Sequence, residues 1–310
     1  MFRVLVSDKI AQEGLAPLLE SDQIVCVQKN VNEVDDLDSY NAILVRSATK
    51  VTAEVMEKMP NLKIIARAGV GVDNVDLVAA KERGIVVVNA PTGNTISTAE
   101  HTFALMLALA RKVCAANASI RKEEWNRAAF GGIELAGKTL GIIGFGRIGS
   151  EVAKRAQAFD MNIIAYSPSM TKERADNLGI TAGTINEILA QSDIITFHCA
   201  ITPETKGLLN MDSFKKTKPG VMIINAARGG IVDEEALKHY LANGHVAGAA
   251  IDVYPQEPPA DYDLVKMDNV VATPHIAAST AEAQLKVAVI VAEDVLNVAT
   301  GKPVQNPVTV

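Results

Sequence analysis

Three polar residues in the second half of the chain are of the types that acid–base chemistry on a small anion requires. Arg228 lies in the segment Asn-Ala-Ala-Arg-Gly-Gly-Ile-Val-Asp, Glu257 in Glu-Pro-Pro, and His275 in Thr-Pro-His. Histidine exchanges protons near neutral pH, and arginine binds a carboxylate or a developing oxyanion. Glu257 would orient the imidazole ring and favour its protonated form. We therefore predict Arg228, Glu257 and His275 as catalytic residues, with Arg228 and His275 also contacting the substrate.

Each of these residues has a simpler interpretation when it is taken alone. A histidine after proline is commonly a surface residue, Arg228 would cap a helix or pair with Asp233, and Glu257 would be a solvated loop acid. However, each lies in a segment that follows an apolar run typical of a strand. Ligands of open α/β sheets bind at the carboxyl ends of the strands, so the joint placement favours the functional interpretation.

A glycine-rich turn follows the apolar run 139–143 and precedes a helical segment. In this Gly-x-Gly-x-x-Gly pattern Gly144 allows a tight turn, Gly146 lets the backbone approach a pyrophosphate, and Gly149 lets the helix pack close to the strand. A turn without a ligand is the alternative, but the strand–turn–helix context is typical of dinucleotide binding. Together with the acid–base set, the pattern indicates hydride transfer between a nicotinamide dinucleotide and a 2-hydroxy acid.

The second part of a dinucleotide fingerprint is an acid about 20 residues further on, which binds the ribose hydroxyls. Here the strand 162–166 ends in Ser167-Pro-Ser, so the acid is missing. Ser167 would hydrogen-bond the ribose without repelling a 2′-phosphate, and Lys172 and Arg174 nearby would accept one. NAD is the favoured cofactor, and NADP stays open.

Composition narrows the class of protein. The 310 residues, 48% of them hydrophobic, are enough for two packed domains. A net charge of −6 argues against nucleic-acid or membrane partners, which require basic surfaces. The three cysteines have no C-x-x-C spacing, which suits reduced thiols and predicts no metal site. We expect a soluble cytoplasmic protein with a small anionic substrate.

The apolar pattern predicts the fold class. Short β-branched runs such as Val4–Val6 and Ile24–Val27 alternate with helix-length segments such as Ile10–Glu20. This alternation indicates parallel sheets covered by helices on both faces. It pauses at one long helical segment, residues 97–121, and then resumes. We therefore predict an α/β fold with two doubly wound parallel-sheet domains.

The chain resembles the D-isomer-specific 2-hydroxyacid dehydrogenases over nearly its whole length. The resemblance rests on the glycine fingerprint, the Arg228, Glu257 and His275 segments, and two N-terminal segments that begin at Arg46 and Arg67. It implies a Rossmann dinucleotide-binding domain, residues 98–284, inserted into a flavodoxin-like substrate domain, residues 1–97 plus 285–310. It also implies a homodimer or higher homo-oligomer. Many members that act on phosphoglycerate carry a C-terminal regulatory module, so we expect a short form or a trimmed piece.

The resemblance also implies which residues contact the cofactor. It suggests that Asp252 and the backbone near Ala226 hold the nicotinamide, and that His198 and Cys199 line the cofactor groove. Together with the fingerprint, the expected cofactor-binding residues are Val70, Gly144, Gly146, Arg147, Ile148, Gly149, Ser167, His198, Cys199, Ala226, Ala227, Arg228, Asp252, His275, Ala277 and Ala278.

A phosphorylated acid requires one anion site for its carboxylate and one for its phosphate, and the first third of the chain offers candidate residues for these sites. Arg46 is the candidate for the phosphate, and Ser47 would add a hydrogen bond. Backbone N–H groups of residues 68–71 would form a nest for a carboxylate. Ordinary surface charge is the alternative for the arginines. The expected substrate-binding residues are Arg46, Ser47, Arg67, Gly69, Val70, Gly71, Arg127, Arg228 and His275. Of these, Arg127 would come from a partner subunit.

The expected reaction is the NAD-dependent oxidation of D-3-phosphoglycerate to 3-phosphohydroxypyruvate, which leads to serine, with His275 as the acid/base. Reduction of glyoxylate or hydroxypyruvate is the nearest alternative, and it would need less positive charge around Arg46. A dinucleotide-sensing protein that binds a partner and barely catalyses is the third hypothesis. The complete set of Arg228, Glu257 and His275 weighs against it.

Overall fold

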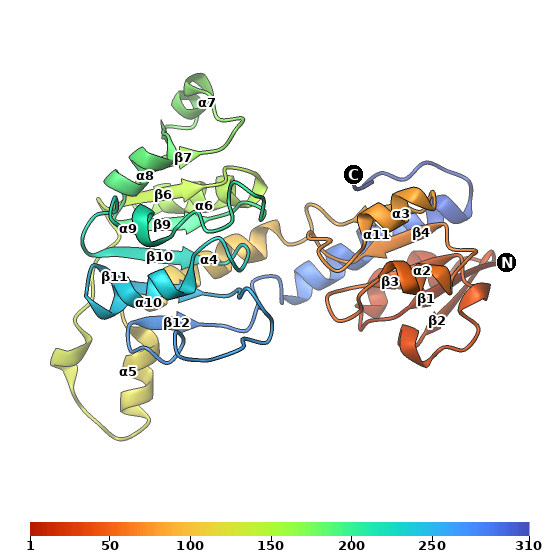
Figure 1. Cartoon of the computed structure of the whole chain (residues 1–310), viewed down its shortest axis with the longest axis horizontal. Coiled ribbons are helices and arrows are strands. Elements are labelled where there is room, and N and C mark those ends of the chain that lie inside the picture. Colours follow the sequence, from red (N-terminus) through yellow and green to blue (C-terminus); the bar gives the residue numbers. More distant parts are fainter. Residues whose placement is uncertain (310) are drawn as a thin grey trace. The chain divides into compact units, whose positions relative to one another are not determined.

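The computed structural model of the chain describes residues 1–309, which form two compact units. The first unit comprises residues 1–94 together with the segment from Ala278 onward, and the second comprises Thr95–Ala277. The sequence analysis placed these limits at residues 97 and 285. Each unit is built on one parallel sheet with helices packed against it (Figure 1). The predicted α/β class with two parallel sheets is confirmed.

The first unit has a five-stranded sheet in the order β2-β1-β3-β4-β5, which is the flavodoxin-like order expected for it. Its strands are β1 (Phe2–Val6), β2 (Ile24–Gln28), β3 (Ala42–Val45), β4 (Ile64–Arg67) and β5 (Val86–Asn89). Its helices are α1 (Ala16–Leu19), α2 (Ala53–Glu57), α3 (Leu77–Glu82) and α11 (Ala281–Ala299), with 3-10 turns at Gln12–Leu15, Val31–Glu33 and Leu37–Ser39.

Side-chain alternation explains why these strands are apolar throughout. Val4 and Val6 point into a core shared with α1 and α11, whereas Leu5 between them points into a second core shared with α2 and α3. Successive side chains of a strand face opposite sides of the sheet, and here both sides are covered. All four residues of β3 are accordingly buried.

Helix α11 returns from the second unit to cover the first sheet. Val287, Val291 and Val295 are spaced four residues apart and form one buried stripe along the helix. Thr280 caps its first turn by accepting a hydrogen bond from the amide of Ala283 at 3.1 Å. The first unit therefore needs both ends of the chain, because its core contains side chains from each.

The second unit has a seven-stranded parallel sheet in the order β12-β11-β10-β9-β6-β7-β8, the doubly wound Rossmann order with one additional strand. Its strands are β6 (Thr139–Ile143), β7 (Asn162–Tyr166), β8 (Thr181–Ala182), β9 (Ile194–Phe197), β10 (Val221–Asn225), β11 (Val246–Ile251) and β12 (Val270–Ala272). Its helices are α4 (Thr95–Ala110), α5 (Val113–Ile120), α6 (Arg147–Ala158), α7 (Lys172–Asn177), α8 (Ile185–Gln191), α9 (Met211–Phe214) and α10 (Glu234–Ala242), with a 3-10 turn at Arg127–Phe130.

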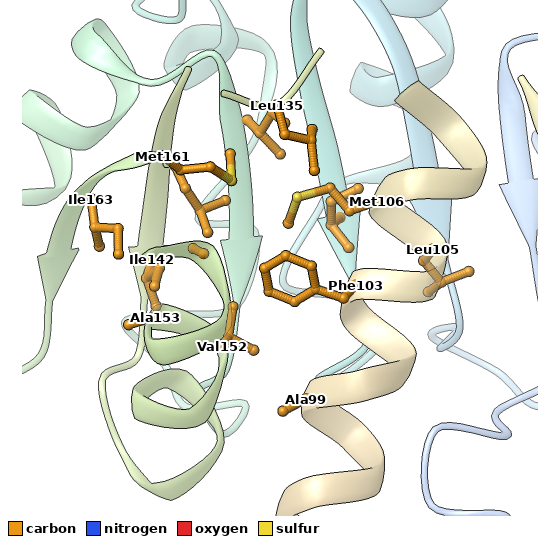
Figure 2. Packing of buried hydrophobic residues seen from close by; sticks show 14 of the residues in the cluster. Ala99, Phe103, Leu105, Met106, Leu135, Ile142, Val152, Ala153, Met161 and Ile163 are labelled. Carbon is orange, nitrogen blue, oxygen red and sulfur yellow. The ribbon is translucent and has the colours of Figure 1, made fainter. Parts of the chain in front are cut away.

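Helices α4 and α6 pack side by side on one face of this sheet. Figure 2 shows Phe103 and Met106 on α4 within the cluster that also holds Val152 of α6 and Ile142 of β6. Burying each such side chain contributes roughly 1.5–3 kcal/mol. This packing fixes α4 against the sheet and so determines where its polar residues lie.

The single helix expected over residues 97–121 is wrong, because the chain bends by 62° between α4 and α5. Lys112 adopts a left-handed conformation with φ of 51°, which interrupts the helix just after Ala110. Most side chains of α5 are exposed. Among residues 1–309 no single helix is long and apolar enough to cross a membrane, and only the bent pair α4–α5, taken together, passes by length and composition.

Candidate active site

The loop between β6 and α6 has the geometry of a pyrophosphate cradle. Gly144 has φ of +100°, and a Cβ there would lie 2.5 Å from the carbonyl carbon of His198, so only glycine fits. At Gly146 a Cβ would meet no atom within 4 Å, so the backbone there faces open space. Helix α6 begins at Arg147 and directs its unpaired N–H groups toward the same space. The residues present therefore fit a bound dinucleotide.

Parallel strands place the other predicted cofactor residues at the same edge of the second sheet. Ser167 follows β7, His198 and Cys199 follow β9, Ala226 follows β10, and Asp252 follows β11. Carboxyl ends of parallel strands share one edge, so these side chains gather where the glycine loop lies. Val70 and Ala278 belong to the first unit.

Arg228 is held by a tight turn after β10. The buried Asn225 donates its side-chain amide to the carbonyl of Arg228 at 3.0 Å and accepts the amide of Ala227 at 3.1 Å. The Arg228 guanidinium donates to the carbonyl of Ala227 at 2.7 Å. Asn225 thus closes the turn from both sides and limits where the guanidinium can point. It is a positioning residue that the sequence analysis did not single out.

His275 and Glu257, two of the predicted catalytic residues, form a hydrogen-bonded pair in the second unit. The Nδ1 of His275 lies 2.7 Å from Oε2 of Glu257, and the other carboxylate oxygen accepts the amide of Tyr254 at 3.2 Å. An ionised carboxylate only accepts hydrogen bonds, so Nδ1 must carry the hydrogen. Nε2 is then the atom left to exchange a proton. About half of the imidazole side chain is exposed, at 48%, so a substrate can reach it.

The loop that carries His275 is held by the carboxylate of Asp252. Oδ1 accepts the Thr273 hydroxyl at 2.6 Å and the Ile276 amide at 2.8 Å, and Oδ2 accepts the Ala277 amide at 2.9 Å. Burial alone would raise the pKa of Asp252, but these hydrogen bonds and one from His101 outweigh it and lower the pKa. His275, between the bonded residues, has φ of 54°. The anchored amides hold it in this uncommon conformation.

The family resemblance implies that Asp252 helps to hold the nicotinamide. Its side chain has no exposed surface, and both of its oxygens accept hydrogen bonds from the chain itself. In this structure the carboxylate holds the loop that carries His275. Its contact with a nicotinamide stays a prediction.

His101 on α4 joins the same network. Its Nε2 lies 3.2 Å from the hydroxyl of Thr273 and 3.5 Å from Oδ1 of Asp252. The Thr273 hydroxyl already donates to Asp252, so His101 must be the donor in its own contact. No sequence signal indicated this role, because His101 is 172 residues away from Thr273 and sits in an apolar helix.

His198 has an unusual environment for a histidine. Burial lowers its pKa to about 3, so the ring is neutral at ordinary pH. Its Nε2 lies 3.1 Å from the hydroxyl of Thr196, while Nδ1 is buried without a hydrogen-bond partner among residues 1–309. The backbone of His198 and Cys199 also passes close to Gly144. His198 thus lies beside the glycine loop in its uncharged form, and its contact with the cofactor stays a prediction.

In the first unit Arg46 follows β3 and starts a tightly held loop. The amides of Arg46 and Thr49 donate to one oxygen of Asp8, at 2.6 and 3.1 Å, and the Thr49 hydroxyl donates to the other at 2.6 Å. Asn74 donates to the carbonyls of Arg46 and Thr49 at 2.7 and 2.6 Å. Partial burial lowers the pKa of Arg46, and the negative charge of Asp8 opposes that effect. Ser47 is exposed.

The nest expected over residues 68–71 is smaller than predicted. The amide of Ala68 donates to the carbonyl of Val45 and that of Gly69 to the carbonyl of Arg67, each at 2.8 Å. Only the amides of Val70 and Gly71 remain for an anion. Asn94, which the sequence analysis did not consider, has a buried side-chain oxygen with no hydrogen-bond partner within residues 1–309.

Arg127 lies on the exposed segment that follows α5. Trp125 beside it is 79% exposed, which is unusual for a large aromatic side chain. The proposed contact of Arg127 with a partner subunit stays a prediction.

Comparisons with known proteins agree with this geometry. Residues 103–277 match the family model described as D-isomer specific 2-hydroxyacid dehydrogenase, NAD binding domain. Over 99% of its length the chain is 57% identical to the D-3-phosphoglycerate dehydrogenase of Bacillus subtilis (strain 168) and 54% identical to that of Archaeoglobus fulgidus. It spans about 59% of the length of each of these relatives.

Solved structures show the same architecture. A crystal structure of a protein from Thermus thermophilus superposes with a TM-score of 0.90 at 35% identity, covering 99% of this chain and 100% of that one. The match extends over both units of the chain.

Proposed function

The chain belongs to the D-isomer specific 2-hydroxyacid dehydrogenases, and we propose that it oxidises D-3-phosphoglycerate to 3-phosphohydroxypyruvate with NAD. The observation that carries the proposal is the His275–Glu257 pair, at the same sheet edge as the glycine loop and Arg228. The names of the relatives from Bacillus subtilis and Archaeoglobus fulgidus support the choice of substrate.

Each catalytic residue has a distinct task in this proposal. Arg228 binds the substrate carboxylate and draws electron density from the carbon that becomes a ketone. Nε2 of His275 takes the hydroxyl proton, and Glu257 stabilises the imidazolium that forms. The bound nicotinamide supplies the acceptor for the hydride from the same carbon. The products are the 2-oxo acid, reduced dinucleotide and one proton held on His275.

The substrate phosphate requires a second cationic site. We propose Arg46 for it, with Ser47 adding a hydroxyl donor. Asp8 and Asn74 hold the loop that carries both residues. An arginine is well suited because its planar guanidinium forms paired hydrogen bonds with phosphate oxygens.

Steady-state assays with D-3-phosphoglycerate, glyoxylate and hydroxypyruvate, each with NAD(H) and NADP(H), test the proposed function. We expect D-3-phosphoglycerate with NAD to give the highest kcat/KM of the three acids. A higher value for glyoxylate or hydroxypyruvate would identify a reductase. Tight dinucleotide binding without turnover of any acid would indicate a sensing protein.

We also propose that the chain assembles as a homodimer or larger homo-oligomer through α5 and the segment after it. Val113, Ile120 and Trp125 there are 52%, 49% and 79% exposed, and adjoining apolar side chains in contact with solvent are a feature of interaction surfaces. Light scattering after gel filtration should give a mass of at least two chains. Replacing both Ile120 and Trp125 by serine should lower it, and a monomeric wild-type chain would contradict the proposal.

A further inference from the structure

The end of strand β7 carries a cluster of two hydroxyls and one guanidinium, made of Ser167, Ser169 and Arg174. We call it the ribose-end cluster. The hydroxyl oxygens of Ser167 and Ser169 lie 3.4 Å apart, and Nη1 of Arg174 donates to the Ser169 hydroxyl at 3.5 Å. Serine hydroxyls and a guanidinium can all donate hydrogen bonds to one acceptor group. The cluster is therefore suited to an anion.

The ribose-end cluster lies directly beside the glycine loop. The amide of Gly144 donates to the carbonyl of Tyr166 at 2.8 Å, so the loop is tied to the residue before Ser167. The Arg174 guanidinium carbon lies 5.5 Å from the ring centre of Phe145, within cation–π range. A dinucleotide with its pyrophosphate at this loop would direct its adenosine ribose to the end of β7.

The cluster contains no carboxylate, which is the group that usually selects NAD at this place. A carboxylate there accepts hydrogen bonds from the ribose hydroxyls and repels a 2′-phosphate. On the adjoining helix α7 the acids are Glu173 and Asp176, and Asp176 is paired with Lys172 at 2.6 Å. The Lys172 ammonium is engaged in that pair, whereas the Arg174 guanidinium contacts Ser169 of the cluster.

We propose that the ribose-end cluster binds the 2′-phosphate of NADP, so that the chain uses NADP as well as NAD. The proposal rests on the dinucleotide site of the proposed function and specifies its cofactor range. Arg174 supplies the positive charge, and Ser167 and Ser169 donate to phosphate oxygens. With NAD the same hydroxyls hydrogen-bond the free ribose hydroxyl, so binding of the smaller cofactor is retained.

Calorimetric titration with 2′,5′-ADP and 5′-AMP tests the cluster without any turnover. The two probes differ only in the 2′-phosphate, so the ratio of their dissociation constants isolates its contribution. We expect the wild-type chain to bind 2′,5′-ADP about tenfold more tightly, as one or two charge-assisted hydrogen bonds would provide. Equal affinities for the two probes would overturn the proposal.

Three variants assign that ratio to named groups. Arg174→Gln should bring it close to one while leaving 5′-AMP binding unchanged. Lys172→Gln removes a cation from the same helix, but one paired with Asp176, and should leave the ratio as in the wild type. Ser167→Asp should weaken 2′,5′-ADP about a hundredfold, because two like charges then meet, and should reverse the order of the two affinities.

The outcomes separate this proposal from the proposed function. Equal effects of Arg174→Gln and Lys172→Gln on the ratio would show general charge attraction and not a built site. A chain that binds 2′,5′-ADP as expected but oxidises none of the three acids would keep this inference and refute the activity. Turnover with NAD together with equal affinities for the probes would do the reverse.

Discussion

Asp8 in the first unit and Asp252 in the second hold loops in the same way. Each follows a strand, β1 or β11, and binds the loop after the neighbouring parallel strand, β3 or β12. Each accepts two backbone amides and one threonine hydroxyl, and the hydroxyl distance is 2.6 Å in both cases. At the carboxyl edge of each sheet an aspartate thus holds a neighbouring loop by the same types of hydrogen bond, but the two loops carry different residues.

The two aspartates differ in how deeply their carboxylates are buried. Asp252 is fully buried and has His101 as an additional neighbour, whereas Asp8 is only partly buried. The loop held by Asp252 displays His275, whose rigid ring has to meet a proton at hydrogen-bond distance. The loop held by Asp8 displays Arg46, whose long side chain can adjust its position. In our proposal a proton-transfer group therefore sits on the loop held by the fully buried carboxylate, and an anion-binding group on the loop held by the partly buried one.

The largest effect should come from His275→Asn. Removing a general base costs about a thousandfold in kcat, whereas cofactor affinity should fall much less, because most of the expected dinucleotide contacts come from other residues. Single-turnover kinetics together with NAD titration would separate the two properties. Equal losses in kcat and in cofactor affinity would mean that His275 has a structural role. The loop held by Asp252 would then not carry a proton-transfer group.

Asp252→Asn should have the next largest effect on kcat. The amide nitrogen cannot accept a hydrogen bond and would face an N–H donor of the loop, either Ala277 or Ile276. A shift of His275 by about 1 Å costs about a hundredfold in kcat. The variant's thermal midpoint should also fall. If it does not fold, His101→Ala, which leaves the Asp252 carboxylate in place, should still lower kcat with little change in KM.

Asp8→Asn is the matched change in the first unit and should act on KM, with kcat nearly unchanged. It should raise KM less than Arg46→Ala, because Arg46 itself contacts the phosphate in our proposal. Losing one charge-assisted contact corresponds to a rise in KM of about 10- to 100-fold for D-3-phosphoglycerate. A phosphate-free acid should be unaffected. If KM for D-3-phosphoglycerate stays unchanged in Arg46→Ala, the phosphate site is elsewhere.

The smallest effect should be a loss of stability at acid pH that comes from His198 in the second unit. Its folded-state pKa of about 3 lies below the usual 6.5, so unfolding takes up a proton between these values. The stabilisation is complete above pH 6.5 and is lost as the pH falls toward 3. Urea unfolding should show a decrease of at most about 1.4 kcal/mol per pH unit from this group. His198→Gln should flatten that dependence, and an unchanged slope would contradict the assignment.

Much of the fold followed from local pattern. The alternation of apolar runs with helical segments predicted two parallel sheets, and the glycine spacing predicted the loop at Gly144. These features depend on the period of burial and on backbone conformation, which neighbouring residues determine. The family resemblance seen in the motifs is confirmed by the match over residues 103–277. The catalytic roles of Arg228, Glu257 and His275 stay predictions for the variants above to test.

Other features depended on packing between distant segments. The sequence pattern over residues 97–121 is helical throughout, and only the structure shows the left-handed turn at Lys112. His101 reaches Thr273 because α4 is packed against the sheet by Phe103 and its neighbours. Arg174 likewise lies over the ring of Phe145 because the tertiary packing brings α7 close to the glycine loop.

The amino-acid sequence alone was enough to locate the longer strands and the glycine loop and to show which residue types follow those strands. Which of those polar groups are already hydrogen-bonded within the chain was decided by the tertiary fold. Asp252 shows the difference, since its residue type suits a cofactor contact, but its oxygens accept hydrogen bonds from Thr273 and the amides beyond it. The physical reason is that a hydrogen bond depends on positions within a few tenths of an ångström, and these are set by the packing of whole helices and strands.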